Sequence, residues 1–339
     1  MTDIFKISKG LGNLAEETLR FYRQIGVEEV AVPSRFNTRI NLRPLVPPAQ
    51  RKAPGPQPDP WGAEELRRIA DHVRSFDLEP TTLNLPLSRN ILMGRPGRDA
   101  DLEKVRKAIR IAGDVGFRVL TYNFTALRAS EGYGACHNAG RGGAHLRDFD
   151  YQRIRDLPPL PDVGVHTWEE MWERLEYFLT TVIPVAERAG IRLAVHPNDP
   201  PVPEYRGVAQ PLNDLQSLKR LLQVVDSPAN SLFFDTGVAT EWGEDAAAAI
   251  RYFGERDRIA TVHFRNVCVN EPLYKYTETF IDQGECDMRA CMRAFADVGY
   301  SGGIDPDHTP GITADSEESR IGWAFAIGHM IALRSAAYA

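Results

Sequence analysis

The sequence predicts an α/β protein, a single (β/α)8 TIM barrel over residues 1–339, with long loop insertions after the second and fourth strands. Strand-like apolar runs alternate with longer stretches of helical spacing from one end of the chain to the other. Long apolar strands separated by helices are typical of a parallel sheet, and eight such units favour a closed barrel. The alternative is an open doubly wound sheet, but no G-x-G-x-x-G turn follows the first strand.

Each predicted strand is a short run rich in β-branched or aromatic residues, and each is followed by a stretch in which apolar residues recur with helical spacing. Strands are predicted at 3–8, 27–33, 78–84, 117–124, 191–196, 231–236, 259–266 and 302–307. Helices are predicted at 13–25, 62–76, 99–115, 168–189, 213–225, 242–254, 286–298 and 316–336. The expected N-caps are Asp99, Thr167, Asn213 and Ser316, and the expected C-terminal stops are Gly116, Gly190 and Gly299.

Two insertions interrupt this alternation, and both follow strands, so both belong to the end of the barrel where active sites are built. Residues 41–61 are rich in proline, which excludes helix and sheet and predicts an extended loop. Residues 125–166 combine many glycines with aromatic residues and histidine. We expect this second insertion to be a lid or a subunit contact rather than disordered.

The composition excludes several classes of partner. The net charge of −6 comes from interspersed acidic and basic residues, which gives no basic face for nucleic acid or an anionic membrane surface. No apolar run is long enough for a membrane-spanning helix, and the N-terminus lacks the apolar core of a signal peptide. The four cysteines form no C-x-x-C pair and no disulfide framework, which favours reduced thiols and a cytoplasmic location.

Four potential metal ligands stand where predicted strands end: His196, Asp235, His263 and Asp307. In a barrel these strand ends come from the fifth to the eighth strands and share one central mouth. A lone histidine at a strand end is usually structural, but recurrence at four successive strands favours a metal centre. Two imidazoles and two carboxylates suit Mn²⁺ best, with Mg²⁺, Co²⁺ or Zn²⁺ as alternatives.

Residues beside these ligands are candidates for contacts with a substrate. Arg265 lies two residues beyond His263, so on a continuing strand it would share that face and clamp a carboxylate; an ion pair with a loop is the alternative. Asp199 follows a rigid proline-flanked turn and is either a substrate or orienting contact or a turn residue. Tyr122 and Asn123 end the fourth strand and could hydrogen-bond sugar hydroxyls, although Tyr122 could equally belong to the core.

Several blocks resemble the mannonate dehydratase family, whose members are barrels of the xylose-isomerase-like superfamily. The blocks are VLTYNF, HPNDPPVP, VHFRNV, ETFIDQGECDM and GYSGGIDPDH, in this order over roughly residues 78–310. The resemblance implies conversion of D-mannonate to 2-keto-3-deoxygluconate with a divalent metal, usually Mn²⁺, and a homo-oligomer, either dimer or tetramer. It also implies that His196, His263 and Asp307 are metal ligands.

The chain departs from that pattern at three positions. Asp235 stands where the family typically has cysteine, and its D-T-G block is similar to the sugar isomerases and epimerases of the same superfamily. Asp305 stands where the family usually has arginine, and Asn198 where it usually has aspartate. These differences leave the identity of the substrate open.

Three functions remain to be separated. The first is a metal-dependent sugar-acid dehydratase, with His308, Tyr133 or His137 as the base that removes the C2 proton. The second is a sugar isomerase or ketose epimerase, which is weakened because His196 and Asp307 stand where the epimerases have two glutamates. The third is a non-catalytic barrel that binds a carbohydrate.

Overall fold

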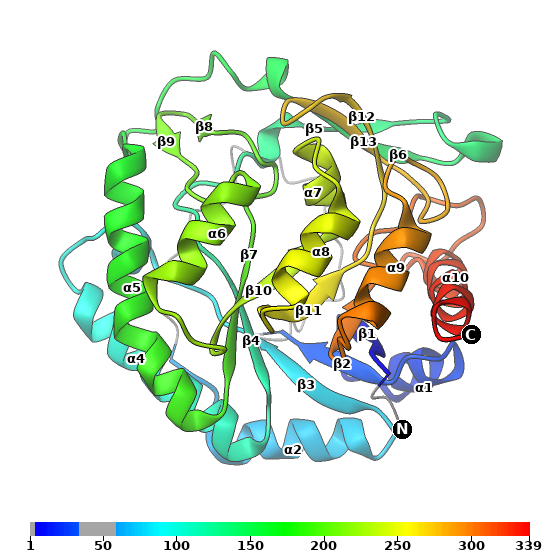
Figure 1. Ribbon diagram of the computed structural model, residues 1–339, viewed down its shortest axis with the longest axis horizontal. Helices are drawn as coiled ribbons and strands as arrows, with labels where there is room; N and C mark the ends of the chain where they lie inside the picture. The colour runs from blue at the N-terminus through cyan, green and yellow to red at the C-terminus, as the bar shows by residue number, and fades with distance from the viewer. Residues whose placement is uncertain (1–3, 34–58) are drawn as a thin grey trace.

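The computed structural model describes residues 4–33 and 59–339, and its centre is a closed barrel of parallel strands (Figure 1). Around the ring the order is β1-β14-β11-β10-β7-β4-β3-β2. The strands are β1 (Lys6–Gly10), β2 (Glu29–Val32), β3 (Glu79–Asn84), β4 (Val119–Asn123), β7 (Arg192–His196), β10 (Asn230–Asp235), β11 (Ile259–His263) and β14 (Gly303–Asp305). All eight coincide with predicted strands, so the barrel prediction is confirmed.

Helices cover the outside of the barrel and mostly follow the predicted segments. They are α1 (Glu16–Gln24), α2 (Ala63–Arg74), α3 (Arg89–Leu92), α4 (Arg98–Val115), α5 (Trp168–Ala189), α6 (Leu215–Val224), α7 (Thr236–Glu241), α8 (Ala246–Gly254), α9 (Met288–Asp297) and α10 (Arg320–Ala337). The short helices α3 and α7 were not predicted. Helix α7 matters for the site because it begins directly after Asp235, at the end of β10.

The helix boundaries show which local signals were reliable. Thr167 forms a full capping box at the start of α5, and Gly190 ends that helix in the left-handed conformation, as predicted. The other expected N-caps were wrong by one to three residues: Gly97, Asp214 and Ser319 cap α4, α6 and α10. In α6 the neighbouring Asp214 is the better acceptor, and its side chain accepts a hydrogen bond from the Ser217 amide.

The segment 125–166 is not a loop without secondary structure. It contains β5 (Tyr133–Cys136) and β6 (Leu146–Asp150), which join β12 (Val267–Glu271) and β13 (Lys275–Glu278) in an antiparallel sheet of order β12-β13-β6-β5. Figure 1 shows this sheet at the top of the view, above the end of β10 that leads into α7. We call it the mouth sheet. The insertion predicted at 41–61 lies almost entirely outside the described residues.

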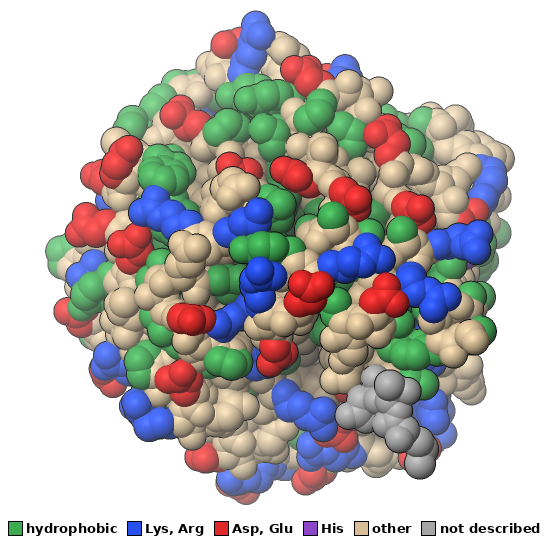
Figure 2. All heavy atoms as spheres, viewed as in Figure 1, with side chains coloured by type: hydrophobic (Ala, Val, Ile, Leu, Met, Phe, Trp, Pro, Cys, Tyr) green, Lys and Arg blue, Asp and Glu red, His purple; other side chains and the backbone are tan. Residues whose placement is uncertain are grey.

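Among the described residues the buried hydrophobic side chains form three clusters, one inside the barrel, a larger one between the barrel and its helices, and one around the mouth sheet. Inside, Val119, Ala194 and Ala260 pack with Phe233, so the centre of the barrel is filled by few and mostly small side chains. The larger cluster holds the outward-facing strand residues and the buried helix faces. On the face shown in Figure 2, acidic and basic side chains are interspersed. No helix within 4–33 and 59–339 has the length and apolar character of a membrane span.

Candidate metal centre at the barrel mouth

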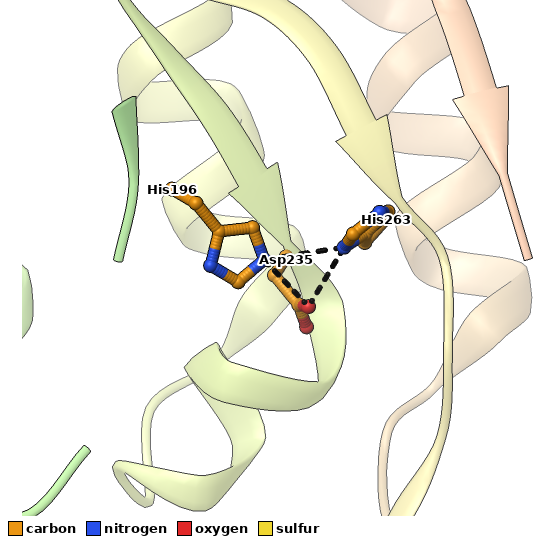
Figure 3. Close-up of side chains that lie close together, drawn as sticks. All are labelled: His196, Asp235 and His263. Atoms are coloured by element: carbon orange, nitrogen blue, oxygen red, sulfur yellow. Dashed lines mark hydrogen bonds and ion pairs between the residues drawn. The ribbon is translucent and has the colours of Figure 1, made fainter. Parts of the chain in front are cut away.

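Three of the four predicted ligands meet at the ends of β7, β10 and β11. The ligand atoms of His196, Asp235 and His263 all lie within 4.8 Å of one another (Figure 3). His196 Nε2 is 3.1 Å from His263 Nδ1, and Asp235 Oδ2 is 3.4 Å from the former and 3.5 Å from the latter. Asp235 and His263 are register partners on adjacent parallel strands, which explains why their side chains share one face.

Hydrogen bonds to the backbone hold two of these donors in place. His196 Nδ1 donates to the carbonyl oxygen of Pro197 at 2.8 Å, which leaves Nε2 as the nitrogen directed at the cluster. Asp235 caps α7, because its Oδ1 accepts from the Val238 amide at 2.8 Å while Oδ2 faces the histidines. The unpredicted helix α7 therefore orients the carboxylate.

The pKa shifts at the cluster favour a divalent cation at Asp235 and oppose it at His263. Burial would raise the pKa of Asp235, but Arg265 and hydrogen bonds from His196 and His263 hold it well below its usual value. Burial lowers the pKa of His263, but the carboxylates of Asp307 and Asp235 raise it overall, so a proton competes with a metal there. Two imidazole nitrogens and an ionised carboxylate are an ordinary donor set for Zn²⁺, Co²⁺ or Mn²⁺, so the residues fit the group.

Asp307 lies beside this cluster, at the other edge of the His263 ring. Its Oδ1 is 3.4 Å from His263 Nε2, whereas His196 and Asp235 face Nδ1 of the same ring. The backbone of Asp307 is left-handed, with φ of 58°, and its amide donates to Asp305 Oδ1 at 2.8 Å. The structure therefore brings all four predicted ligands together, with Asp307 outside the closest group of three.

Asp305 is held by a buried cation that the sequence analysis did not single out. Lys9 Nζ is 3.1 Å from Asp305 Oδ1, and the Gly10 amide donates to Oδ2 at 2.7 Å. Burial opposes the charge on Lys9, but the attraction of Asp305 raises the lysine pKa overall. This pair joins β1 to β14 and fixes the turn that carries Asp307.

Arg265 is held in buried ion pairs, which matches the predicted alternative of an ion pair rather than a substrate clamp. It is buried, and its Nε and Nη1 donate to Asp235 Oδ2 at 3.0 Å and Glu241 Oε1 at 2.7 Å. Its Nη2 and Nε also lie 3.4 Å from Asp199 Oδ2 and 3.3 Å from Asp307 Oδ2. Strand β11 ends at His263, so the alternation that would have placed Arg265 on the same face no longer applies.

Asp199 and Tyr133 belong to the same buried network. Tyr133 donates its hydroxyl to Asp199 Oδ1 at 2.6 Å, and the hydroxyl of Tyr276 lies 3.3 Å from the same oxygen. Both Asp199 oxygens are therefore held by side chains of the protein. Burial raises the pKa of Tyr133 well above its usual value, and the neighbouring Asp199 carboxylate adds to the shift, so the phenol keeps the proton that it donates to Asp199.

His308 lies beside the cluster, between two carboxylates. Its Nε2 is 3.2 Å from Asp307 Oδ2, and its Nδ1 is 3.0 Å from Glu278 Oε2. The side chain is 29% exposed, so it is accessible from the mouth while it remains anchored between two carboxylates. Arg147 of β6 contacts the same ring, with Nη2 3.2 Å from His308 Nε2 and 3.3 Å from Nδ1.

The structure places the remaining predicted residues in three different environments. Tyr122 points into the outer core against Phe178, with ring centroids 5.1 Å apart, and its hydroxyl has no hydrogen-bond partner among the described residues. This position matches the predicted alternative that Tyr122 belongs to the core. Asn123 is exposed and pairs in register with His196, so it faces the mouth. His137 is exposed in the turn after β5, where its contact is with His145 rather than with the cluster.

The sequence analysis missed four charged residues of the site: Lys9, Arg147, Glu241 and Glu278. Glu278 lies in the ETFIDQGECDM block, which was a usable signal. Arg147 reaches the site only through the pairing of β6 with β13, more than a hundred residues away in the chain, and no local pattern announces it. A cavity of about 200 Å³ adjoins the centre, and besides His263 and Asp305 its polar lining is Ser8, Thr82, Asn84, Thr121 and Thr261.

Comparison with known proteins found one matching family model and several related sequences. A family model described as D-mannonate dehydratase (UxuA) matches residues 164–335, slightly more than half of the chain. A mannonate dehydratase of Enterococcus faecalis is 29% identical over 322 residues, covering 85% of this chain and 88% of the relative. A mannonate dehydratase of Thermotoga maritima is 29% identical over 280 residues, covering 73% and 78%.

The fold has the same neighbours among solved structures. The crystal structure of mannonate dehydratase from Streptococcus suis serotype 2 superposes with a TM-score of 0.82 at 24% identity, covering 99% of this chain and 94% of that one. The structure of an L-ribulose 3-epimerase superposes with a TM-score of 0.61 at 15% identity, covering 99% and 96%. These likenesses show the barrel fold that the two enzymes share with this chain.

Proposed function

The chain belongs to the D-mannonate dehydratase family, and from that premise we propose that it is a divalent-metal-dependent hydro-lyase, which converts D-mannonate to 2-keto-3-deoxygluconate and water. The observation that carries the proposal is the convergence of His196, Asp235 and His263 at the end of the barrel where active sites are built. A cavity next to this cluster, whose lining includes the hydroxyl groups of Ser8, Thr82, Thr121 and Thr261, supports a polyhydroxylated substrate.

His196, Asp235 and His263 would hold the cation, with Asp307 close enough to join them through a change of its side chain or of the His263 ring. A divalent cation bound there supplies Lewis-acid stabilisation of the negative charge that develops on substrate oxygens when the C2 proton leaves. We favour Mn²⁺, which the resemblance implies and which mixed imidazole and carboxylate donors accept.

The protein's own groups move the proton. In a dehydration the C2–H bond breaks, its electron pair forms the C2–C3 double bond, and the C3 hydroxyl leaves with a proton as water. The resulting enol then takes up a proton at C3 and gives up the proton of its C2 hydroxyl, which leaves the 2-keto acid. We assign the proton transfer to His308, because it combines exposure toward the mouth with anchoring by Asp307 and Glu278.

Arg265 and Glu241 act behind the site rather than on the substrate. Arg265 donates to Asp235 Oδ2 and so fixes the carboxylate that faces the histidines. Glu241 in turn fixes Arg265 from the far side, through the 2.7 Å contact with Nη1. This buried arrangement keeps the ligand carboxylate in one orientation before a metal arrives.

A substrate screen tests the proposal directly. The protein, loaded with Mn²⁺, is incubated with a panel of aldonates that includes D-mannonate, and 2-keto-3-deoxy acids are assayed. We expect turnover that a chelator removes, a His196→Ala variant that loses metal, and a His308→Gln variant that keeps metal but loses kcat. Conversion of neutral ketoses without any keto-deoxy acid would instead favour an isomerase or epimerase. Negligible metal content together with no turnover would favour a binding protein.

Two further properties belong to the same proposal. The resemblance supports a homo-oligomer, a dimer or a tetramer, which light scattering behind gel filtration measures. The free thiols of Cys136, Cys268, Cys286 and Cys291 support a reducing compartment such as the cytoplasm, which localisation of a tagged protein tests.

A further inference from the structure

Four cationic side chains contact the carboxylates of the site, and two of them are accessible. Lys9 is buried against Asp305, and Arg265 is buried among several carboxylates. Arg128 and Arg147, both from the segment after β4, have 54% and 37% of their side chains exposed. Arg128 is bound through Nε to the backbone oxygen of Asp199 at 2.9 Å, whereas Arg147 is the one that reaches His308.

The mouth sheet fixes the position of Arg147. Arg147 and Glu278 are register partners in the β6–β13 pair, so the pairing of the strands sets the two side chains opposite each other. Arg147 Nε donates to Glu278 Oε2 at 2.7 Å, and Nη2 donates to Oε1. The guanidinium also lies over the ring of Tyr133, with its carbon 4.2 Å from the ring centroid. A strand, a carboxylate and an aromatic ring thus hold this cation.

Glu278 occupies one edge of the guanidinium, and on the next edge Nη2 lies against the His308 ring while Nη1 has no partner among the described residues. Glu278 takes the edge formed by Nε and Nη2. Across the described parts of the chain Nη1 has no hydrogen-bond partner, and Nη2 lies 3.2 Å from His308 Nε2, so the edge formed by Nη1 and Nη2 faces the residue assigned to proton transfer. A guanidinium edge of two parallel N–H groups matches a carboxylate in a bidentate geometry.

We propose that Arg147 is the residue that binds the carboxylate of the aldonate, through Nη1 and Nη2, and thereby places C2 beside His308. This inference rests on the proposed function and adds the origin of its selectivity for acids over neutral sugars. The mouth sheet is then the element that recognises the anion, while the barrel cavity takes the hydroxylated remainder of the substrate. The sequence had suggested Arg265 for binding this carboxylate, and we assign that role to Arg147 instead.

The chain offers a matched control in Arg153. This residue also makes a bidentate pair, with Nη1 and Nη2 at 2.9 and 2.6 Å from the two oxygens of Asp148, and its side chain is 40% exposed. Asp148 follows Arg147 on β6, so its side chain points to the opposite face of the mouth sheet. Arg153→Gln therefore removes a comparable ion pair from the same sheet without touching the proposed carboxylate site.

The test compares kcat and KM for D-mannonate in the Mn²⁺-loaded wild type, Arg147→Gln, Arg147→Lys and Arg153→Gln. We expect KM to rise by about 10- to 100-fold in Arg147→Gln, because hydrogen bonds to a charged group are lost, with a smaller change in kcat. Arg147→Lys should also show a raised KM, because an ammonium lacks the paired edge. Arg153→Gln should stay within about twofold of wild type, as exposed pairs contribute little. Millimolar guanidinium chloride should partly restore Arg147→Ala, and sodium chloride at equal ionic strength should not.

Three results would overturn the assignment. The first is an Arg147→Gln protein that has the wild-type KM and also retains its melting temperature and metal content. If the glutamine variant does not fold, a wild-type KM in Arg147→Lys counts in its place. The second is an equal rise of KM in Arg153→Gln. If the wild type itself fails to turn over D-mannonate, the dehydratase proposal fails, and calorimetric titration with D-mannonate then decides on Arg147. In that titration, equal affinity in wild type and Arg147→Gln, or no binding by either, is the third result.

Discussion

Arg265 should contribute more to the stability of this protein than any surface ion pair, and Arg265→Met is the substitution that measures it. The guanidinium contacts Asp235, Glu241, Asp199 and Asp307, all of them largely or fully buried. Methionine fills a similar volume but leaves these carboxylates without their cation. Glu241 is affected most, because its Oε2 already lacks a hydrogen-bond partner in the described structure and its Oε1 would lose the one from Arg265.

The expected loss follows from the cost of uncompensated buried charge. Removing one partner of a buried ion pair costs about 3–5 kcal/mol. For 339 residues, an unfolding entropy of about 2.1 cal/mol/K per residue gives about 0.7 kcal/mol/K, so the melting temperature should fall by about 4–7 °C. The control is Arg251→Met, which breaks a half-exposed pair with Asp297 at 3.4 Å and should cost about 1 kcal/mol or less.

The assay is thermal unfolding, followed by circular dichroism or calorimetry, of metal-free protein in the presence of a chelator. Metal must be absent because a bound cation would supply the positive charge that the substitution removes. A melting temperature of Arg265→Met that matches the Arg251→Met control would refute the reasoning. It would mean that water or protonation already compensates the carboxylates around position 265.

Three other predictions test the metal centre, the core residue Tyr122 and a buried acid. His196→Ala should weaken binding of Mn²⁺ by about 100-fold or more in a calorimetric titration, since loss of a mere supporting contact already costs 10- to 100-fold; unchanged affinity would remove His196 from the centre. Tyr122→Phe should leave KM unchanged and keep or raise the melting temperature, because the hydroxyl it deletes is buried and finds no partner in residues 4–33 and 59–339; a raised KM would restore the substrate contact. Burial raises the pKa of Glu29 above its ordinary 4.5 despite the hydrogen bond from Thr81, so ionised Glu29 is disfavoured in the folded state. The penalty is absent below pH 4.5 and grows as pH rises through the folded pKa, so Glu29→Gln should raise the melting temperature at pH 7 and not at pH 4. An equal effect at both values would contradict the assignment.

The sequence predicted the barrel well because its signals are local and repeated. Each barrel strand is a short apolar run, and the ligands stand where such runs stop, so His196, Asp235 and His263 could be placed at one mouth without knowing any long-range contact. The alternation rule failed where a strand had already ended, as at Arg265. On β4, where the strand does continue, the same rule places the adjacent residues Tyr122 and Asn123 on opposite faces, so they could not both face the mouth.

The remainder of the site depends on pairings between segments far apart in the chain. Arg147 and Glu278 meet only because β6 pairs with β13, and Lys9 meets Asp305 only because the first and last strands close the barrel. No periodicity within either segment specifies such a partner. The helix α7 was missed for a different reason, since a six-residue helix gives too short a pattern to detect.

The mouth sheet has a mechanical consequence. Its strands come from two places on the rim, after β4 and after β11, which are separated around the ring by β7 and β10. The sheet is therefore attached to the barrel at two places and not at a single hinge. To open it, the backbone hydrogen bonds between β6 and β13 would have to break. Amide protons in that ladder, including that of Tyr276, should exchange slowly whether or not a sugar acid is present, and reactants should enter beside the sheet, not beneath a moving cover.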